Sequence, residues 1–185
     1  MRFLVFLFLS MLLFSACNSQ DSGRGIMDAE PMGKDVSSLL NAEQPTRPIS
    51  ECPVTKNGAA SFVPTSPELS ISSGQFWFGT GTLWTSLPES GEWNGLPHTR
   101  DGYSQKTFWW SEGYSALDEP NPELKVSGKR LDSPTVVLKT SPAAHAIASD
   151  IGSAMLSGVV FPSTGCWEIT GQYKGGSLTY VIWLS

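Results

Sequence analysis

Histidine and clustered basic residues are scarce in this chain. Its 185 residues include two histidines, His98 and His145, and 12 lysines and arginines against 17 aspartates and glutamates, a formal net charge of −5. No run of basic residues is longer than Lys129-Arg130. A partner bound through its phosphates needs a basic surface, so we expect no nucleic-acid partner. A metal site would need ligands that converge from elsewhere in the chain, so we expect no metal and no cofactor.

The sequence also lacks the common catalytic motifs. There is no Gly-x-Ser-x-Gly elbow, and Gly79-Thr80-Gly81 lacks the further glycines of a phosphate-binding loop. We therefore expect no catalytic residues and a protein that is not an enzyme. A hydrolase remains the least favoured alternative, because acidic residues are plentiful in turns and His98 shares one turn with Asp101.

Long apolar runs are confined to the N-terminus, where Arg2 precedes an apolar stretch over residues 3–14 and Ser15-Ala16-Cys17 follows. An apolar stretch of about 7–15 residues before small residues is typical of a secretory signal, not of a membrane span. The pattern resembles the lipobox of bacterial lipoproteins, with Phe14 where that family usually has Leu. The resemblance implies a signal peptide over residues 1–16 and acyl chains on Cys17. The alternative is an ordinary signal that is cut after Ala16.

Cysteine is the next scarce residue, with three in the chain. If Cys17 carries lipid, Cys52 and Cys166 remain as a pair in an oxidising compartment, and we expect them to form a disulfide. The alternative is a catalytic thiol at one of the two positions, although neither lies in a recognisable nucleophile motif.

Aromatic residues are absent from residues 17–50, which are polar and contain several glycines and prolines. Such a segment cannot bury enough apolar surface to order itself, so we interpret it as a flexible tether. All seven tryptophans lie beyond it. Residues 51–185 are therefore expected to form one domain.

This domain lacks any long window of apolar residues at helical spacing and instead has short apolar stretches between turn residues. That pattern is typical of an all-β sandwich or barrel. We expect strands at residues 60–63, 75–78, 82–87, 106–111, 124–131, 135–139, 154–161, 166–173 and 178–184, and a short helix at residues 143–150.

The last two expected strands form a hairpin, whose Lys174-Gly175-Gly176-Ser177 sequence predicts a two-residue Gly-Gly turn that pairs Tyr173 with Leu178. One face then carries large apolar residues apart from one glycine and should be core: Trp167, Ile169, Gly171, Tyr173, Leu178, Tyr180, Ile182 and Leu184. Cys166 falls on the opposite face, so its disulfide would hold residues 52–54 over the outside of the hairpin, above Trp183. The alternative is that Gly165 breaks the alternation and turns Cys166 inward.

Trp109 and Trp110 are adjacent in an expected strand, so their side chains leave opposite faces and cannot both enter one core. One of the two rings therefore needs another cover, and the favoured interpretation is that loops cover these rings as a second small core. The alternative is an exposed ring that, with Trp84, Trp93 and Tyr103 nearby in sequence, binds a sugar ring or an apolar side chain of a partner, which makes these five residues the candidate ligand-binding residues.

Several segments carry a resemblance to known proteins. Residues 161–171 (FPSTGCWEITG) and a strand that ends in residues 180–184 (YVIWL) resemble the closing strands of bacterial immunoglobulin-like domains. Residues 76–79 (FWFG), 95–98 (GLPH) and 108–110 (FWW) are similar to segments of uncharacterised secreted or lipid-anchored bacterial proteins. The resemblance covers most of the chain after Glu51 and implies an immunoglobulin-like antiparallel β-sandwich and an extracytoplasmic location.

From these features we expect a bacterial cell-envelope protein, anchored in a membrane by its N-terminal lipid, that presents a binding domain to an envelope protein or glycan. Asn18 favours the outer membrane if the source has two membranes. A carbohydrate-binding module is the alternative function.

Overall fold

The computed structural model describes residues 49–185, apart from residues 60–61 and 66–68. The expected signal peptide, the lipid site at Cys17 and nearly all of the expected tether lie outside these residues, as does half of the strand expected at residues 60–63. None of the helices found in the described part has the length and apolar character needed to cross a membrane.

Strands dominate the described part of the chain, and the one helix among these residues is the short 3-10 helix η1 (Ile49–Glu51). The strands are β1 (Gln75–Thr80), β2 (Leu83–Pro88), β3 (Glu92–Trp93), β4 (His98–Thr99), β5 (Gly102–Trp110), β6 (Lys125–Arg130), β7 (Lys139–Thr140), β8 (Ala144–Ala148), β9 (Gly152–Phe161), β10 (Gly165–Tyr173) and β11 (Gly176–Leu184).

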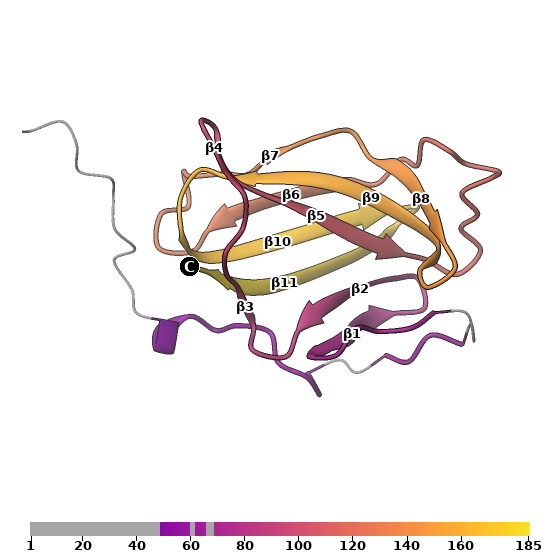
Figure 1. The fold of residues 1–185 in the computed structure, drawn as a ribbon, viewed down its shortest axis with the longest axis horizontal. Helices are drawn as coiled ribbons and strands as arrows, with labels where there is room; N and C mark the ends of the chain where they lie inside the picture. The colour runs from indigo at the N-terminus through magenta and orange to yellow at the C-terminus, as the bar shows by residue number, and fades with distance from the viewer. Residues whose placement is uncertain (1–48, 60–61, 66–68) are drawn as a thin grey trace, which may run out of the picture. The chain divides into compact units, whose positions relative to one another are not determined.

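These strands form two sheets. Among the described residues the larger sheet has the order β1-β2-β5-β9-β7, with β4 beside β5 and β8 beside β9, and the smaller sheet has the order β3-β11-β10-β6. Figure 1 shows β6, β10 and β11 of the smaller sheet behind β5 and β9 of the larger one. The domain is therefore an all-β sandwich, as expected. Every pair is antiparallel except β3–β11, which is parallel, and the immunoglobulin-like assignment stays a prediction.

The main core lies between the sheets and is rich in aromatic side chains from both. Trp109 and Phe161 of the larger sheet and Trp167 and Tyr180 of the smaller one are all buried in it. A side chain at Gly171 would collide with the Trp109 ring, because an added Cβ atom would lie 2.6 Å from Trp109 Cη2. The single glycine on the predicted core face is thus the place where the indole of the opposite sheet meets the backbone.

The β10–β11 hairpin confirms the predicted core face but not the predicted register. Tyr173 pairs with Gly176, so the turn residues are Lys174 and Gly175, with φ angles of 44° and 83°. These left-handed values suit the two-residue turn that matches strand twist. The pairing is displaced by two residues from the prediction, and because side chains alternate with a period of two, every residue keeps its predicted face.

The predicted disulfide is confirmed, with Cα atoms of Cys52 and Cys166 5.6 Å apart. Both cysteines belong to a cluster with Trp183 on the outer face of the smaller sheet, separate from the main core. The backbone N–H of Thr55 donates to the Val181 carbonyl at 2.9 Å, which extends the attachment beyond the disulfide. The segment after Cys52 therefore covers the outer face of β11, and the alternative in which Cys166 turns inward is wrong.

The prediction of a helix at residues 143–150 is wrong. Within this segment Ala144–Ala148 form strand β8, which pairs with β9. Alanine favours a helix, but the unpaired edge of β9 offers a full row of backbone partners, and a tertiary contact of this kind overrides propensity. The two-residue strands β3 and β4 were not expected, since they are too short to show a periodic pattern.

Candidate functional site

Trp109 and Trp110 do leave opposite faces of β5, as their adjacency predicts. Trp109 enters the main core, whereas Trp110 joins Trp84 and Ala154 in a second cluster on the outer face of the larger sheet. Their exposed fractions are 0% for Trp109, 4% for Trp110 and 5% for Trp84. None of these three rings is exposed, and the favoured interpretation, a second small core under loops, is what the structure shows for Trp84 and Trp110.

The loop residues Phe62, Leu69 and Ile151 pack against this outer cluster. Ile151 also accepts a hydrogen bond at 2.8 Å from the indole nitrogen of Trp110, which fixes the ring. Trp77 of β1, which is half-buried, meets Trp110 edge to face with ring centroids 5.0 Å apart. The outer cluster thus ends in a tryptophan whose ring is partly open to solvent.

Trp93 and Tyr103, the other two candidate ligand-binding residues, are half-buried and pack against the main core. Trp93 on β3 contacts Tyr180 with ring centroids 6.3 Å apart. Tyr103 lies at the beginning of β5, where its ring is 4.5 Å from that of His98. The five expected residues do not form one platform, and their role in ligand binding stays a prediction.

A cleft lies where strands β2 and β5 separate. The two strands pair only at Trp84–Trp110 and Thr85–Trp109, and toward the other end of β5 they are no longer joined. The resulting cleft, called here the β2–β5 cleft, has a volume of about 350 Å³. Its lining residues are Ser70, Ile71, Ser72, Gln75, Trp77, Thr85, Ser86, Trp93, Gln105, Lys106, Thr107, Phe108, Trp110, Asp150, Ile151 and Tyr180. It therefore leads from the outer face of the larger sheet to side chains between the two sheets.

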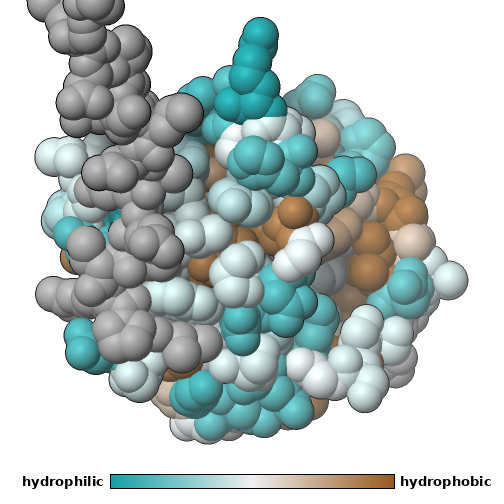
Figure 2. All heavy atoms as spheres, turned by 60° about the vertical axis from the view of Figure 1, so that its left-hand side comes forward, coloured by the Kyte–Doolittle hydropathy of each residue, from teal (hydrophilic) through white to brown (hydrophobic). Residues whose placement is uncertain are grey.

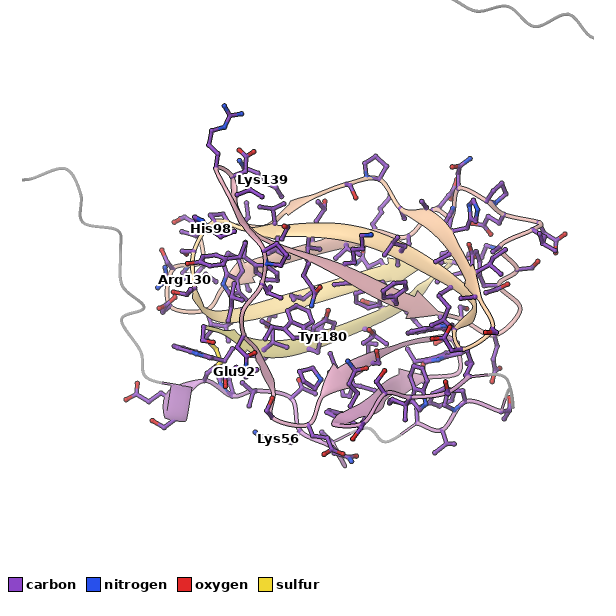
Figure 3. All side chains as sticks on the ribbon, viewed as in Figure 1. Lys56, Glu92, His98, Arg130, Lys139 and Tyr180 are labelled. Carbon is purple, nitrogen blue, oxygen red and sulfur yellow. A yellow bond between two sulfur atoms is a disulfide. The ribbon has the colours of Figure 1, made fainter. Side chains whose placement is uncertain are left out.

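Tyr180, one of the residues that line this cleft, has a buried hydroxyl without a hydrogen-bond partner among the described residues. Its side chain is 1% exposed, and no group in the described part of the chain hydrogen-bonds to its hydroxyl. In Figure 3 it lies in the interior, between β5 and β2 in this view. Burial raises the pKa of Tyr180, so the group stays a neutral hydroxyl that can donate.

The other hydroxyls at the cleft floor are already bonded. Thr85 donates to the Phe108 carbonyl at 2.7 Å, and Thr107 donates to the Ser157 carbonyl at 3.0 Å. A buried hydroxyl without a partner is costly, so native structures rarely keep one without a reason. The sequence placed Tyr180 on the core face but held no signal for this missing bond, because the bond depends on what the opposite sheet brings near.

The cleft also has polar lining residues, and one of them is Lys106. Lys106 is exposed and forms no ion pair with any other residue that the structure describes, whereas Asp150 contributes a carboxylate to the same cleft. Gln105 and Lys106 also line a neighbouring hollow of about 600 Å³ over β5, β7 and β9. Figure 2 shows hydrophobic residues exposed beside hydrophilic ones on the surface seen there. Cleft and hollow thus share two lining residues, Gln105 and Lys106.

The two histidines do not contribute to this cleft. Nδ1 of His145 lies 2.9 Å from the Pro120 carbonyl, and His98 is the first residue of β4 (Figure 3). No group of three or more metal-binding side chains occurs within the described ranges.

Comparison of the chain with protein-family models, with curated proteins and with solved structures returns no match.

Proposed function

We propose that this protein is a non-enzymatic binding module of a bacterial cell envelope. In this proposal acyl chains on Cys17 hold an immunoglobulin-like β-sandwich on the extracytoplasmic side of a membrane, and the β2–β5 cleft contacts the partner.

The cleft is the observation that carries the proposal. Binding sites are concave and combine apolar walls with a few polar groups that lack partners. Here Trp77, Phe108 and Trp110 supply the walls, Lys106 supplies a cation at the rim and Tyr180 supplies a buried hydroxyl without a partner.

The envelope location is supported by two independent features of the chain. The N-terminal pattern around Cys17 resembles a lipoprotein signal. The Cys52–Cys166 disulfide belongs to proteins of oxidising compartments.

Co-sedimentation of the mature chain in detergent with delipidated envelope material of the source bacterium tests the proposal. We expect saturable binding that falls about tenfold when Lys106→Glu reverses the charge at the rim of the cleft. The matched control is Lys125→Glu, which changes an exposed lysine on β6 of the other sheet.

Binding that is equal in both variants would place the contact elsewhere on the domain and contradict the role of the cleft. Absence of any saturable binding by the wild-type chain would contradict the proposed function itself.

A further inference from the structure

We propose that the β2–β5 cleft binds a pyranose unit of a neutral glycan, with the sugar ring against Trp77 and one of its hydroxyl oxygens accepting a hydrogen bond from Tyr180. The inference rests on the proposed function and names the class of ligand.

The aromatic wall is the first argument. Trp77 is half-buried on the outer face of β1, and its ring is held by the perpendicular contact with Trp110, whose centroid is 5.0 Å away. Trp110 is itself fixed by its hydrogen bond to Ile151. A ring that is already ordered loses little entropy on binding, and it suits the flat C–H face of a sugar.

The polar lining is the second argument. Around Trp77 the cleft presents neutral donors and acceptors, among them Ser72, Ser86 and Gln105. One lysine and one aspartate, Lys106 and Asp150, add charges of both signs. Hydroxyl groups both donate and accept, so a polyhydroxylated neutral ligand matches this mixed set better than an anion or a cation does.

Tyr180 is the third argument. Of the hydroxyls that line the cleft floor, Thr85 and Thr107 have partners in the sandwich, whereas the hydroxyl of Tyr180 has none among the described residues. A ligand oxygen that accepts from Tyr180 removes this deficit, and a purely apolar ligand does not.

The size of the cleft limits what can enter. A volume of about 350 Å³ is near the lower end of the range of about 300–1,000 Å³ found for small-molecule sites. The neighbouring hollow shares Gln105 and Lys106 with the cleft and gives a longer chain a way to continue across β5 and β9. This arrangement fits a short stretch of a glycan and not a folded partner.

The test is a titration of the mature chain with three neutral trisaccharides, maltotriose, cellotriose and N-acetylated chitotriose, monitored by tryptophan fluorescence and calorimetry. Polygalacturonate serves as the acidic comparison. We expect saturable binding of at least one neutral trisaccharide, and Lys106→Ala should weaken it about threefold to tenfold while Lys125→Ala has no effect.

Tyr180→Phe gives the sharper result, because it removes only the unpartnered hydroxyl. We expect affinity to fall about tenfold, while the melting temperature of the free protein stays the same or rises. The matched control is Tyr173→Phe, which removes a hydroxyl that donates to Glu119 Oε2 at 2.7 Å. That variant should melt at a lower temperature and bind the sugar normally.

Three outcomes would overturn the inference. The first is that no neutral trisaccharide binds although envelope material still binds in a manner sensitive to Lys106→Glu, which leaves the proposed function standing. The second is that polygalacturonate binds and the neutral sugars do not. The third is sugar binding that Lys106→Ala and Tyr180→Phe leave unchanged, which would place the sugar outside the cleft. If neither sugars nor envelope material bind, the proposed function fails as well.

Discussion

Gly171 shows how a single missing side chain joins the two sheets. It lies on β10 among buried aromatic and aliphatic residues, and the six-membered ring of Trp109 from β5 rests on its backbone. An added Cβ atom would lie 2.6 Å from Cη2 of Trp109, well inside normal contact. Trp109 cannot withdraw easily, because its indole nitrogen donates to Thr107 at 3.0 Å. The spacing of the sheets at this point therefore depends on glycine.

We predict that Gly171→Ala destabilises the domain by about 1–3 kcal/mol, the usual cost of overpacking a core. Chemical denaturation measures the change in the free energy of unfolding. The control is Gly158→Ala on β9, where the nearest atom to the added Cβ is the exposed Ser141 hydroxyl at 3.0 Å; it should change the free energy by no more than about 0.5 kcal/mol. If Gly171→Ala is as stable as the control, the contact with Trp109 is not tight.

At the scale of elements, the loop between β5 and β6 is attached to the turn between β10 and β11 through Glu119. One oxygen of its carboxylate accepts from the Tyr173 hydroxyl at 2.7 Å and from Lys174 Nζ at 2.6 Å. The Glu119 backbone carbonyl accepts from the Tyr114 hydroxyl at 3.2 Å. The hydrogen bonds from Lys174 and then from Tyr173 lower the pKa of Glu119 below its usual 4.5.

The lowered pKa of Glu119 makes the stability that this attachment contributes depend on pH. Glu119 contributes stability that is fully present above its unfolded pKa of 4.5 and is lost as the pH falls through the lower folded pKa. We predict that Glu119→Gln flattens the decline of melting temperature below pH 4.5, as measured by thermal melts across the acid range. Glu123→Gln, a change nearby in the same loop, should keep the wild-type decline. An acid decline that is the same in all three proteins would show that the attachment contributes nothing measurable.

At the scale of the whole molecule, the Cys52–Cys166 disulfide joins the beginning of the described domain to its penultimate strand. It spans 114 residues of sequence. On the chain-entropy account a loop of this length stabilises a fold by up to about 4–5 kcal/mol. Because the bond lies outside the main core, its loss removes this constraint and loosens the cover over Trp183 without opening a cavity between the sheets.

We predict that reduction of the disulfide, or the double change Cys52→Ser with Cys166→Ser, lowers the denaturation midpoint and shifts tryptophan emission to longer wavelength as Trp183 becomes exposed. Denaturation with and without reductant checks this. The double variant is the control, because reductant should have no further effect on it. A midpoint that does not move on reduction would contradict the stabilising role of the bond.

The proposed lipid anchor at Cys17 is tested at the same scale. We predict that Cys17→Ser abolishes both lipid labelling and membrane partitioning, because the acyl chains have no other attachment point. Labelling with a radioactive fatty acid and membrane fractionation measure the two effects, and Cys52→Ser should remain labelled. A Cys17→Ser protein that is processed and stays with the membrane would show that Cys17 does not carry the anchor.

The sequence by itself determined the features that depend on alternation along a strand. It determined that Trp109 and Trp110 leave opposite faces and which residues of the last hairpin form the core, and it favoured an outward Cys166. The pairing of Cys166 with Cys52 was predicted from the number of cysteines and not from alternation. The conclusions about faces hold because the two-residue period of a strand is local, and a displacement of the register by two residues leaves every face unchanged.

Only the tertiary structure decided the features that depend on which strands meet. The free edge of β9 made a strand of residues 144–148 in place of the expected helix, and loops covered Trp84 and Trp110 that the sequence left open to exposure. The separation of β2 from β5, and with it the cleft that reaches Tyr180, arises from pairing between residues far apart in the chain. No local pattern encodes such a gap, because it is set by the packing of two whole sheets against each other.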